Sequence, residues 1–505
     1  MNFSRSLVDC GKMKAVQLLY AKNVISGKKE AVQQILEFFI LIENIAYQKQ
    51  VEVFWAGQDG VWRTTKAEYH ASVGQNLELW RAKATFSAPG NGFLPGNIQF
   101  ALRYRVLGEE YWDNNHSRDY ITGADSGILV HEEVSLLNLG YCQHLQLGQK
   151  VYLVMVAVRR SLSPRRVDIV WTTDGWITQN QTPCLFQKDF WYQTTGGQAG
   201  NPNQYGWEIW VGRIGIGHAY RVEYAIVCDT GTGKIWDNNF GKNYLARREP
   251  LKILTLNLHC YQENDQDAKF SEIARAISEL NLGIICFQEV GEYWNDGRGD
   301  WNSNAAKIIC DRLRKSYHLS YHFYTDWSHI GFARFCEGCA ILSKYRFLAK
   351  ESQYISNSHD IYSIHARKAV MVQVHVPYMG FVNVFSVHLS WWSDGFREQF
   401  ETLRRCASLR HGPDVAATFL CGDFNAAPGS EGYALVTSSQ EYEDQFLKAI
   451  SGQSSQKLRD DHRIDYIFMK GNSNLIVTSA RVLFTGEAYR RVSDHCAYYM
   501  EFEPN

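Results

Sequence analysis

The sequence predicts a multidomain protein in which two β-sandwiches precede one mixed α/β domain. A chain of 505 residues exceeds one ordinary hydrophobic core, so roughly two to four domains are expected. Between about residues 35 and 246 the chain repeats a pattern of short alternating strands. From Leu251 onward, strand patterns alternate with helical ones, which is typical of an α/β domain.

The repeat is recognised from two matching stretches in each copy. Residues 100–115 correspond without a gap to residues 224–239, and both stretches end in Trp-Asp-Asn-Asn. Upstream, Val51-Glu-Val-Phe-Trp55 corresponds to Val167-Asp-Ile-Val-Trp171. Turns rich in Gly, Asn and Asp bound the strands, which favours β-sandwiches. We therefore expect an N-terminal extension at 1–34, a first sandwich at 35–130, a linker at 131–150 and a second sandwich at 151–246.

The stretches 112–120 and 236–244 resemble the family-21 type of starch- and glycogen-binding module, which also occurs in glycogen-targeting subunits of protein phosphatase one. The resemblance implies an α-glucan partner such as glycogen, starch or maltodextrin. Tryptophan and tyrosine rings can lie against the apolar face of a glucose ring, and asparagine amides can bridge its hydroxyls. The expected carbohydrate-binding residues are Tyr47, Lys49, Trp112, Asn115, Tyr120, Trp236, Asn239, Lys242, Asn243 and Tyr244.

The two copies depart from the family pattern in different ways. The second keeps Gly241-Lys242-Asn243 where the first has Ser117-Arg118-Asp119, whereas the first keeps the upstream stretch Ile45-Ala-Tyr-Gln-Lys49. Both copies could contact glucan by different faces, or one copy could bind weakly or be structural. A further alternative is that both are packing domains without a ligand.

In the C-terminal half, the stretch Thr418–Pro428 carries the main chemical signal. Its apolar run is typical of a buried strand and leads into Asp423 and Asn425, which point to the same side at the strand period of two. A carboxylate can take a proton from water and an amide N–H can hold an anionic oxygen, so the pair suits hydrolysis of a phosphate ester. By itself the stretch is equally typical of a strand that runs into a turn.

Further strand-like segments carry polar side chains of the same kinds at or near their ends. These side chains are Asn257, Glu289, His388, Asp465 and the pair Asp494 and His495. A packed β-scaffold can assemble one site from such distant parts of the chain. In this order the segments resemble the endonuclease/exonuclease/phosphatase family of metal-dependent phosphoesterases. The resemblance implies an enzyme, with a four-layer α/β sandwich of the exonuclease III/deoxyribonuclease type over residues 250–505.

The resemblance also implies a metal site. Glu289 and Asn257 would hold a divalent ion, with Asp494 near enough to help through water. Oxygen ligands of this kind suit Mg²⁺ or Mn²⁺ rather than zinc.

Catalytic roles follow from the same resemblance. Asp423 would orient or deprotonate the attacking water, or support a histidine electrostatically. Asn425, His388 and His495 would contact the phosphoryl oxygens. Asp465 would fix the tautomer of His495.

Local stretches narrow the substrate. Tyr324–Gly331 and Val387–Trp392 resemble the bacterial maltose 6'-phosphate phosphatase branch, which implies a phosphate monoester of a sugar. The residues expected to contact the substrate are Trp327, His329, Trp391 and Trp392. The two adjacent tryptophans could instead form the core of a loop. The alternative function is a phosphodiesterase or nuclease with structural β-modules, and a third is a glucan adaptor with an inactive catalytic fold.

Charge and cysteine usage bear on partners and compartment. A net charge of −1 and a pI of about 7.0 disfavour tight electrostatic binding of nucleic acid. The first apolar run begins late and is interrupted by Glu37, so no secretory signal is expected, and no segment has the length of a membrane span. The 12 cysteines show no disulfide framework. We therefore expect a cytoplasmic protein with free thiols and no membrane partner.

Overall fold

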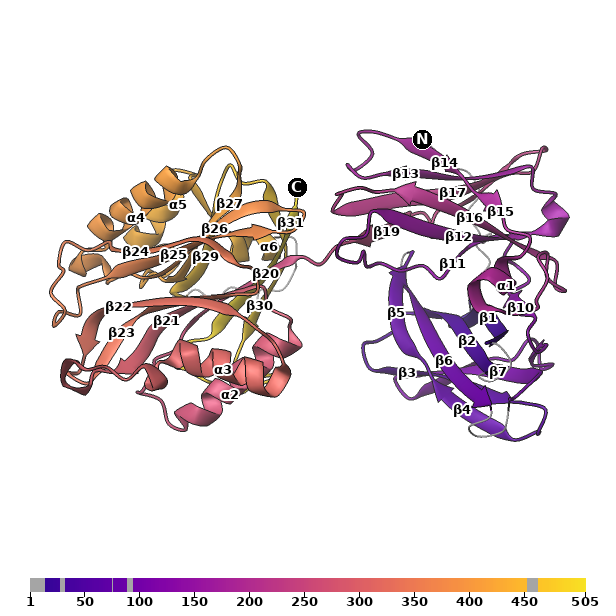
Figure 1. Ribbon diagram of the computed structural model, residues 1–505, viewed down its shortest axis with the longest axis horizontal. Helices are drawn as coiled ribbons and strands as arrows, with labels where there is room; N and C mark the ends of the chain where they lie inside the picture. The colour runs from indigo at the N-terminus through magenta and orange to yellow at the C-terminus, as the bar shows by residue number, and fades with distance from the viewer. Residues whose placement is uncertain (1–13, 28–31, 75, 89–93, 452–461) are drawn as a thin grey trace. The chain divides into compact units, whose positions relative to one another are not determined.

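The computed structural model describes residues 14–27, 32–74, 76–88, 94–451 and 462–505. The chain divides into two compact units between Glu249 and Pro250, where the α/β domain is expected to begin (Figure 1). The first unit is built from β-sheets, and the second combines two sheets with flanking helices. Within the described ranges, no helix is long and apolar enough to cross a membrane.

The first sandwich packs two sheets face to face. One sheet has the order β10 (Gly127–Val130), β1 (Val16–Ser26), β2 (Val32–Glu43), β6 (Leu77–Ala88) and β5 (Glu68–Val73). The other has the order β4 (Trp62–Lys66), β3 (Lys49–Ala56), β7 (Ile98–Val106) and β8 (Glu109–Asp113), with β9 (Tyr120–Thr122) also on β7. Alternating apolar side chains, such as Phe38, Trp55 and Phe100, are buried together in its core.

The expected extension at 1–34 is wrong, because β1 and the start of β2 lie inside that range and pair along most of their length. The side chains of Val16 and Leu18 are buried in the core of the first sandwich. Those of Leu19 and Tyr20 are buried in a second core that includes residues of the next sandwich. A strand buried on both faces lacks the alternation of apolar and polar residues that reveals a half-exposed strand.

The second sandwich repeats the arrangement of two sheets. One sheet has the order β11 (Leu136–Leu139), β12 (Val151–Arg159), β16 (Trp207–Gly215) and β15 (Leu185–Phe186), and a short helix, α1 (Phe190–Thr195), follows β15 in sequence. The other has the order β14 (Asn180–Pro183), β13 (Arg166–Thr172), β17 (Arg221–Asp229) and β18 (Lys234–Asp237), with β19 (Tyr244–Arg247) also on β17. The expected linker at 131–150 is therefore wrong in part, because it contains β11, which pairs with β12.

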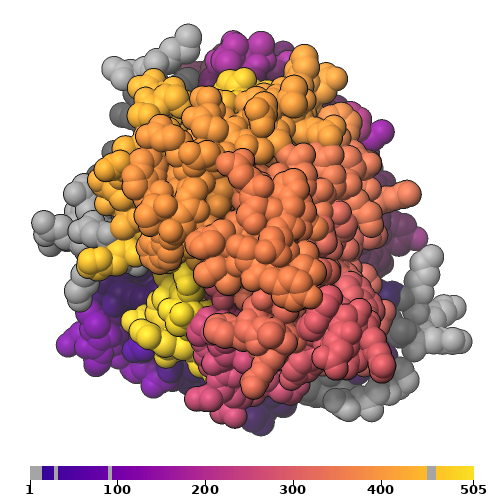
Figure 2. All heavy atoms as spheres, turned by 90° about the vertical axis from the view of Figure 1, so that its left-hand side faces the viewer, coloured from indigo at the N-terminus to yellow at the C-terminus, as the bar shows by residue number. Residues whose placement is uncertain are grey.

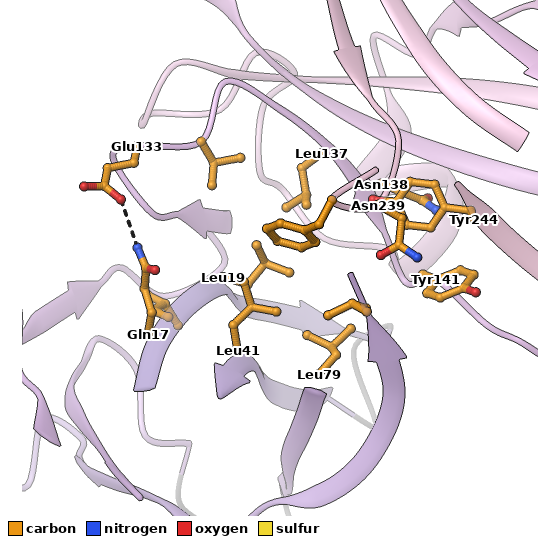
Figure 3. A pocket seen from close by; sticks show the side chains of 14 residues that line it. Gln17, Leu19, Leu41, Leu79, Glu133, Leu137, Asn138, Tyr141, Asn239 and Tyr244 are labelled. Atoms are coloured by element: carbon orange, nitrogen blue, oxygen red, sulfur yellow. Dashed lines mark hydrogen bonds between the residues drawn. The ribbon is translucent and has the colours of Figure 1, made fainter. Parts of the chain in front are cut away.

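The two sandwiches share one hydrophobic core within the N-terminal unit. Leu19, Leu41 and Leu79 of the first sandwich belong to the same buried cluster as Leu137 and Tyr244 of the second. Figure 3 shows these residues around a cavity of about 40 Å³. A cavity of this size has room for water but not for a sugar ring. The space is a gap in the packing between the sandwiches.

The C-terminal unit contains two six-stranded sheets. The first has the order β22 (His322–Gly331), β23 (Phe335–Ser343), β21 (Ile284–Tyr293), β20 (Leu251–Asn257), β31 (Ala497–Pro504) and β30 (Leu475–Leu483). The second has the order β24 (Phe347–Tyr354), β25 (Lys368–Val376), β26 (Gly380–His388), β27 (Val415–Asp423), β29 (Asp465–Lys470) and β28 (Tyr442–Asp444).

Helices cover the outer faces of this pair of sheets (Figure 1). They are α2 (Gln266–Glu279) and α3 (Ala305–Tyr317) beside the first sheet, α4 (Phe396–Arg410) and α5 (Glu431–Thr437) beside the second, and the short α6 (Gln445–Ile450). Ile253 and Ile284 from the first sheet share a buried cluster with Val384 and Phe419 from the second. The order helix, sheet, sheet, helix confirms the predicted four-layer fold.

Candidate active site

The ends of parallel strands bring the predicted residues together. Asn257 ends β20, which runs parallel to β21, and His388 and Asp423 end the parallel strands β26 and β27. Asp465 begins β29 and is the antiparallel Cα partner of Asp423. Because parallel strands end at the same edge of a sheet, these polar side chains collect at one edge of the two-sheet core.

Asn257 links the two sheets. Its Nδ2 donates to Glu289 Oε1 at 2.9 Å and to Asp423 Oδ2 at 3.1 Å. Its Oδ1 accepts from the backbone N–H of His259 at 3.0 Å. This arrangement corrects the expected role of Asn257, because the amide presents its nitrogen, not its oxygen, to the carboxylates. Asn257 could bind a cation only after its amide group turned over.

Asp423 is the centre of the site. Its Oδ1 accepts from the backbone N–H of Asn425 at 2.8 Å, and its Oδ2 lies 3.6 Å from His388 Nε2 and 3.8 Å from His495 Nε2. Burial and the neighbouring carboxylate of Asp465 raise the pKa of Asp423 to about 7, although His495 acts in the opposite direction. A carboxyl group with this pKa can exchange a proton near neutral pH.

His495 and Asp465 form the pair that the sequence predicts. His495 Nδ1 lies 2.6 Å from Asp465 Oδ2. Burial disfavours the charged ring, but this hydrogen bond and the carboxylates of Asp465, Asp423 and Asp494 outweigh burial and raise the pKa of His495 to about 9. The ring is therefore a cation at neutral pH, and it brings positive charge to a cluster of acids.

Glu289 lies close to other carboxylates, whose negative charges repel its own. Burial, and then repulsion from Glu337 and Asp423, raise its pKa to about 7. The ring of His388 lies beside this carboxylate, with Nδ1 3.9 Å from Glu289 Oε1. Burial, and then electrostatic repulsion from Arg367, His329 and His495, hold the pKa of His388 well below its usual range, so this ring is neutral.

Asp494 lies beside a histidine that the sequence analysis missed. Its Oδ1 is 3.5 Å from His259 Nδ1, which is also 2.8 Å from Glu263 Oε1. Glu263 in turn forms an ion pair with Lys269. His259 could have been found from the sequence, because it lies two residues after Asn257.

Backbone strain marks the same positions. The backbone φ angles of Glu289, Asn425 and His259 are +48°, +47° and +43°. Residues other than glycine rarely adopt this left-handed conformation. Gly422, immediately before Asp423, has φ of +146°, and a Cβ there would lie 1.9 Å from the carbonyl oxygen of Val387. Only glycine allows β26 and β27 to approach this closely beside His388 and Asp423.

The four predicted substrate contacts fall into three classes. Trp391 is 56% exposed and free to meet a ligand. Trp327 is half-buried, with its ring 5.9 Å from that of Trp294. Trp392 is also half-buried and packs on Phe396 and Arg397, so it belongs mainly to the support of α4.

His329 corrects the fourth expectation. Its side chain is buried, with Nε2 3.2 Å from Glu337 Oε1 and Nδ1 3.0 Å from Ser328 Oγ. It lines a small cavity of about 10 Å³ with Glu337, Arg367 and His388, among others. His329 is therefore buried in the same small cavity as His388 rather than on an open sugar-binding surface. Glu337 and Arg367 were missed from the sequence, because neither ends a recognisable strand.

On the face of the C-terminal unit shown in Figure 2, pink atoms from residues near 290, orange atoms from residues near 350–400 and yellow atoms near the C-terminus contribute to one surface. Because the colour follows the residue number, this surface combines segments that lie far apart in the sequence.

In the N-terminal unit, the tyrosines of the repeated motif face inward. Tyr120 donates to both carboxylate oxygens of Asp113 at 3.1 and 2.9 Å, and Tyr244 donates to those of Asp237 at 2.8 Å each. Both rings are buried. The expectation that Tyr120 and Tyr244 bind carbohydrate is therefore wrong.

The side-chain amide nitrogens of the motif asparagines also donate hydrogen bonds within the protein. Nδ2 of Asn115 donates to the Asp119 carbonyl at 2.9 Å, and Nδ2 of Asn239 donates to the Asn243 carbonyl at 2.8 Å. Nδ2 of Asn243 donates to Glu223 at 2.8 Å. These bonds close loops whose residues adopt positive φ, including Asn115, Asn239 and Asn243. The three asparagines thus stabilise loops, in contrast to the expected contact with sugar.

Other expected contacts remain on the surface. Tyr47 is 97% exposed, and Trp112 is 44% exposed with its ring 5.2 Å from that of Phe54. Lys242 is exposed and Trp236 is half-buried. Lys49 differs, because its side chain is 3% exposed and its Nζ lies 3.0 Å from Glu78, so its charge is already neutralised.

Comparisons with known proteins agree with this division of the chain. Residues 254–495 match the model of the Endonuclease/Exonuclease/phosphatase family. Residues 20–122 and 132–247 match the model of the family-21 carbohydrate/starch-binding module. The second match begins at 132, inside the segment expected to be a linker.

Similar proteins resemble one unit or the other. Glucoamylase 1 of Rhizopus oryzae is 40% identical over 86 residues, and human protein phosphatase 1 regulatory subunit 3E is 41% identical over 80. Each match covers 16% of this chain, but only 13% and 28% of the respective relative.

Two solved structures are each similar to about half of the chain. An endonuclease/exonuclease/phosphatase family protein from Leptotrichia buccalis is 26% identical, with a TM-score of 0.43, over 50% of this chain and 99% of that chain. The mannosyl-6-phosphatase Bt3783 of Bacteroides thetaiotaomicron is 15% identical, with a TM-score of 0.37, over 50% of this chain and 99% of that one.

Proposed function

We propose that the C-terminal unit hydrolyses phosphate monoesters on maltose, maltodextrin or glycogen-type α-glucans, and that the N-terminal unit tethers it to the glucan. The observation that carries the chemistry is the position of Asp423, within 4 Å of both His388 and His495 and hydrogen-bonded to Asn257. These groups can hold a phosphoryl group and accept a proton from water at one place.

A divalent cation fits this site. Glu289, Glu337 and His388 offer ligand atoms within 4.8 Å of one another, two of them carboxylate oxygens, and burial followed by repulsion from Glu337 and Asp423 raises the pKa of Glu289 to about 7. Hard oxygen donors of this kind suit Mg²⁺ or Mn²⁺. Glu289 would hold the ion, Asp494 would approach it through water, and Asn257 would join after its amide turned. Bound there, the ion would neutralise negative charge on the phosphoryl group.

The residues of the chain supply the remaining chemistry. Asp423 accepts the proton of the attacking water, whose oxygen forms a bond to phosphorus while the bond to the sugar oxygen breaks. The sugar oxygen leaves with the bonding electron pair and takes up a proton from solvent. Asn425 and the ring N–H of His388 hold terminal phosphoryl oxygens, and the cationic ring of His495, oriented by Asp465, stabilises the charge that develops on them. Phosphate leaves without a covalent enzyme intermediate.

The sugar preference rests on two features. Trp391, three residues after His388, presents a ring that is 56% exposed, on which a pyranose can stack. The match of the N-terminal unit to the starch-binding module supports a glucan over other sugars. Tethering raises the local concentration of glucan ends at the active site. The 11 described cysteines are free thiols, in keeping with the cytoplasmic location that we also propose.

The decisive experiment compares phosphate release from maltose 6'-phosphate, phosphorylated glycogen and a DNA duplex, each with Mg²⁺ and with excess chelator. We expect release from the first two, complete loss in chelator and recovery with Mg²⁺ or Mn²⁺. Cleavage of DNA in preference to the sugar esters would establish the alternative, a nuclease or phosphodiesterase with structural β-modules. Full turnover in chelator would disprove the metal assignment.

A further inference from the structure

Arg367 is a cation at the site to which neither family resemblance nor sequence pattern gives a role. It immediately precedes β25 and is half-buried, with Nη1 3.2 Å from His388 Nδ1 and Nε 3.5 Å from Ser390 Oγ. In the described part of the chain it forms no ion pair with a carboxylate, unlike the adjacent Lys368, whose Nζ lies 2.9 Å from Asp326. The guanidinium therefore keeps donors that the protein does not use.

The ring of His388 lies between two groups that can only donate. Its Nδ1 faces Arg367 Nη1, and its Nε2 faces Asn425 Nδ2 at 3.2 Å. Arginine has no acceptor, and the amide nitrogen of Asn425 is fixed as a donor by its 2.8 Å hydrogen bond to the Leu389 carbonyl.

This geometry leaves an excess of donors. A neutral imidazole has one accepting nitrogen, so in either tautomer one of the two contacts sets N–H against N–H. A protonated ring would make both contacts repulsive. Glu289 and Asp423 lie 3.9 and 3.6 Å from the ring, but neither accepts a hydrogen bond from Arg367. An anionic oxygen between the guanidinium and the ring would satisfy the unused N–H groups.

The surroundings match such an oxygen. The small cavity beside Arg367 and His388 has a volume of about 10 Å³, comparable with one water-sized group, and its lining combines four basic side chains, His329, Arg367, Lys368 and His388, with one carboxylate, Glu337. Ser390 accepts only one of the guanidinium N–H groups. A guanidinium offers paired donors in a fixed fork that suits the oxygens of a phosphoryl group.

We propose that Arg367 binds a terminal oxygen of the substrate phosphoryl group and selects monoesters over diesters. A monoester presents three terminal oxygens and close to two negative charges near neutral pH, whereas a diester presents two oxygens and one charge. A half-buried guanidinium with free donors therefore favours the monoester. This inference rests on the proposed phosphatase function and names its specificity-determining residue.

The test measures binding of inorganic phosphate to the full-length chain in Mg²⁺, by calorimetry, without turnover. In Arg367→Met we expect phosphate affinity to fall about tenfold or more, as loss of a charge-assisted hydrogen bond does. Arg367→Lys keeps the charge and should recover part of the affinity. The control Lys350→Met removes an exposed cation that does not line this cavity, so its effect should stay within about twofold.

A second readout tests selectivity. For 4-nitrophenyl phosphate and bis(4-nitrophenyl) phosphate, the ratio of the two kcat/KM values should fall about tenfold in Arg367→Met. Unchanged phosphate affinity in a folded Arg367→Met, or in Arg367→Lys if the former does not fold, would overturn the inference and leave Arg367 a positioning residue for His388. A wild-type chain that binds phosphate but releases none from monoesters would reject the proposed function and leave this assignment standing.

Discussion

Asp237 in the N-terminal unit and Asp423 in the C-terminal unit are both buried carboxylates at the ends of strands. Asp237 accepts hydrogen bonds from the Tyr244 hydroxyl and from the backbone N–H of Asn138, each at 2.8 Å. Asp423 has Asp465 as its cross-strand partner and two histidine rings at 3.6 and 3.8 Å. Hydrogen-bond donors surround Asp237, whereas Asp423 also has a second buried carboxylate, that of Asp465, whose charge repels its own.

This difference separates the structural motif of the repeat from the proposed active site. Each repeat copy uses its aspartate to tie a buried tyrosine to the first strand of its sandwich, through Leu18 in the first copy and Asn138 in the second. The proposed active site gathers carboxylates from both sheets, and burial together with neighbouring carboxylates raises the pKa of Glu289 and of Asp423 to about 7. Such costs persist where function maintains them.

The comparison is tested most strongly at Asp423. Asp423→Asn should lower turnover on maltose 6'-phosphate about a hundredfold or more, because the proton acceptor is lost. Thermal stability of the C-terminal unit should stay the same or rise, since the substitution removes one of several buried, mutually repelling acids. Phosphate release and calorimetric unfolding of the full chain measure the two effects. A folded variant with near-native turnover would contradict the assignment.

The positions of strand ends explain why much of the proposed active site was predictable from the sequence. His388, Asp423 and Asp465 follow or precede apolar runs, so their meeting at one sheet edge follows from the fold. The orientation of the Asn257 amide was not predictable, because it depends on the backbone N–H of His259. Arg367 and Glu337 were not predictable either, since their positions depend on how loops and the other sheet pack.

In the N-terminal unit, the sequence located the repeat but not the direction of its side chains. Tryptophan, tyrosine and asparagine are equally suited to sugar binding and to closing a loop. Tyr120 and Tyr244 stack on Phe100 and Tyr224 with ring centroids 5.2 Å apart in each case, a contact that sequence spacing does not reveal. For a similar reason β1 was not predicted. Both faces of this strand are buried, so its sequence lacks the alternation of apolar and polar residues that indicates a strand.

The structural role of the repeat motif is tested at Asp237. Asp237→Ala should destabilise the N-terminal unit by about 2–4 kcal/mol, because it leaves a buried tyrosine hydroxyl and a buried backbone N–H without an acceptor. Turnover on maltose 6'-phosphate should stay within a few-fold of wild type. Denaturant unfolding of the full chain, with hydrogen exchange to assign the transition, measures the loss. Asp113→Ala tests the first copy. Full stability in both variants would show that these aspartates do not stabilise the sandwiches.

Glucan binding is tested by an exposed and a buried tyrosine. Tyr47→Ala, with its ring 97% exposed in wild type, should weaken retention on glycogen about fivefold, as loss of one stacking ring does. Tyr120→Phe keeps the buried ring and should leave retention unchanged, while it lowers stability by about 1 kcal/mol through loss of its hydrogen bond to Asp113. Affinity electrophoresis in glycogen gels measures both. Equal retention for wild type and Tyr47→Ala would remove Tyr47 from the binding surface.

The smallest expected effect is a pH dependence of the stability of the N-terminal unit, caused by the Asp237 carboxyl group. Burial is the main cause that raises the pKa of Asp237 to about 6, although hydrogen bonds from Tyr244, Asn138 and Asn239 oppose it. Because the folded form binds this proton more tightly than the unfolded chain, Asp237 stabilises the unit as the pH falls through about 6, and that contribution is lost as the pH rises. Between pH 7 and pH 5 the gain should be about 1 kcal/mol. Other groups titrate in this range, so the measured quantity is the difference between wild type and Asp237→Asn, in the unfolding transition that Asp237→Ala shifts. A difference that does not change between pH 7 and pH 5 would show that the hydrogen bonds to Asp237 compensate fully for its burial.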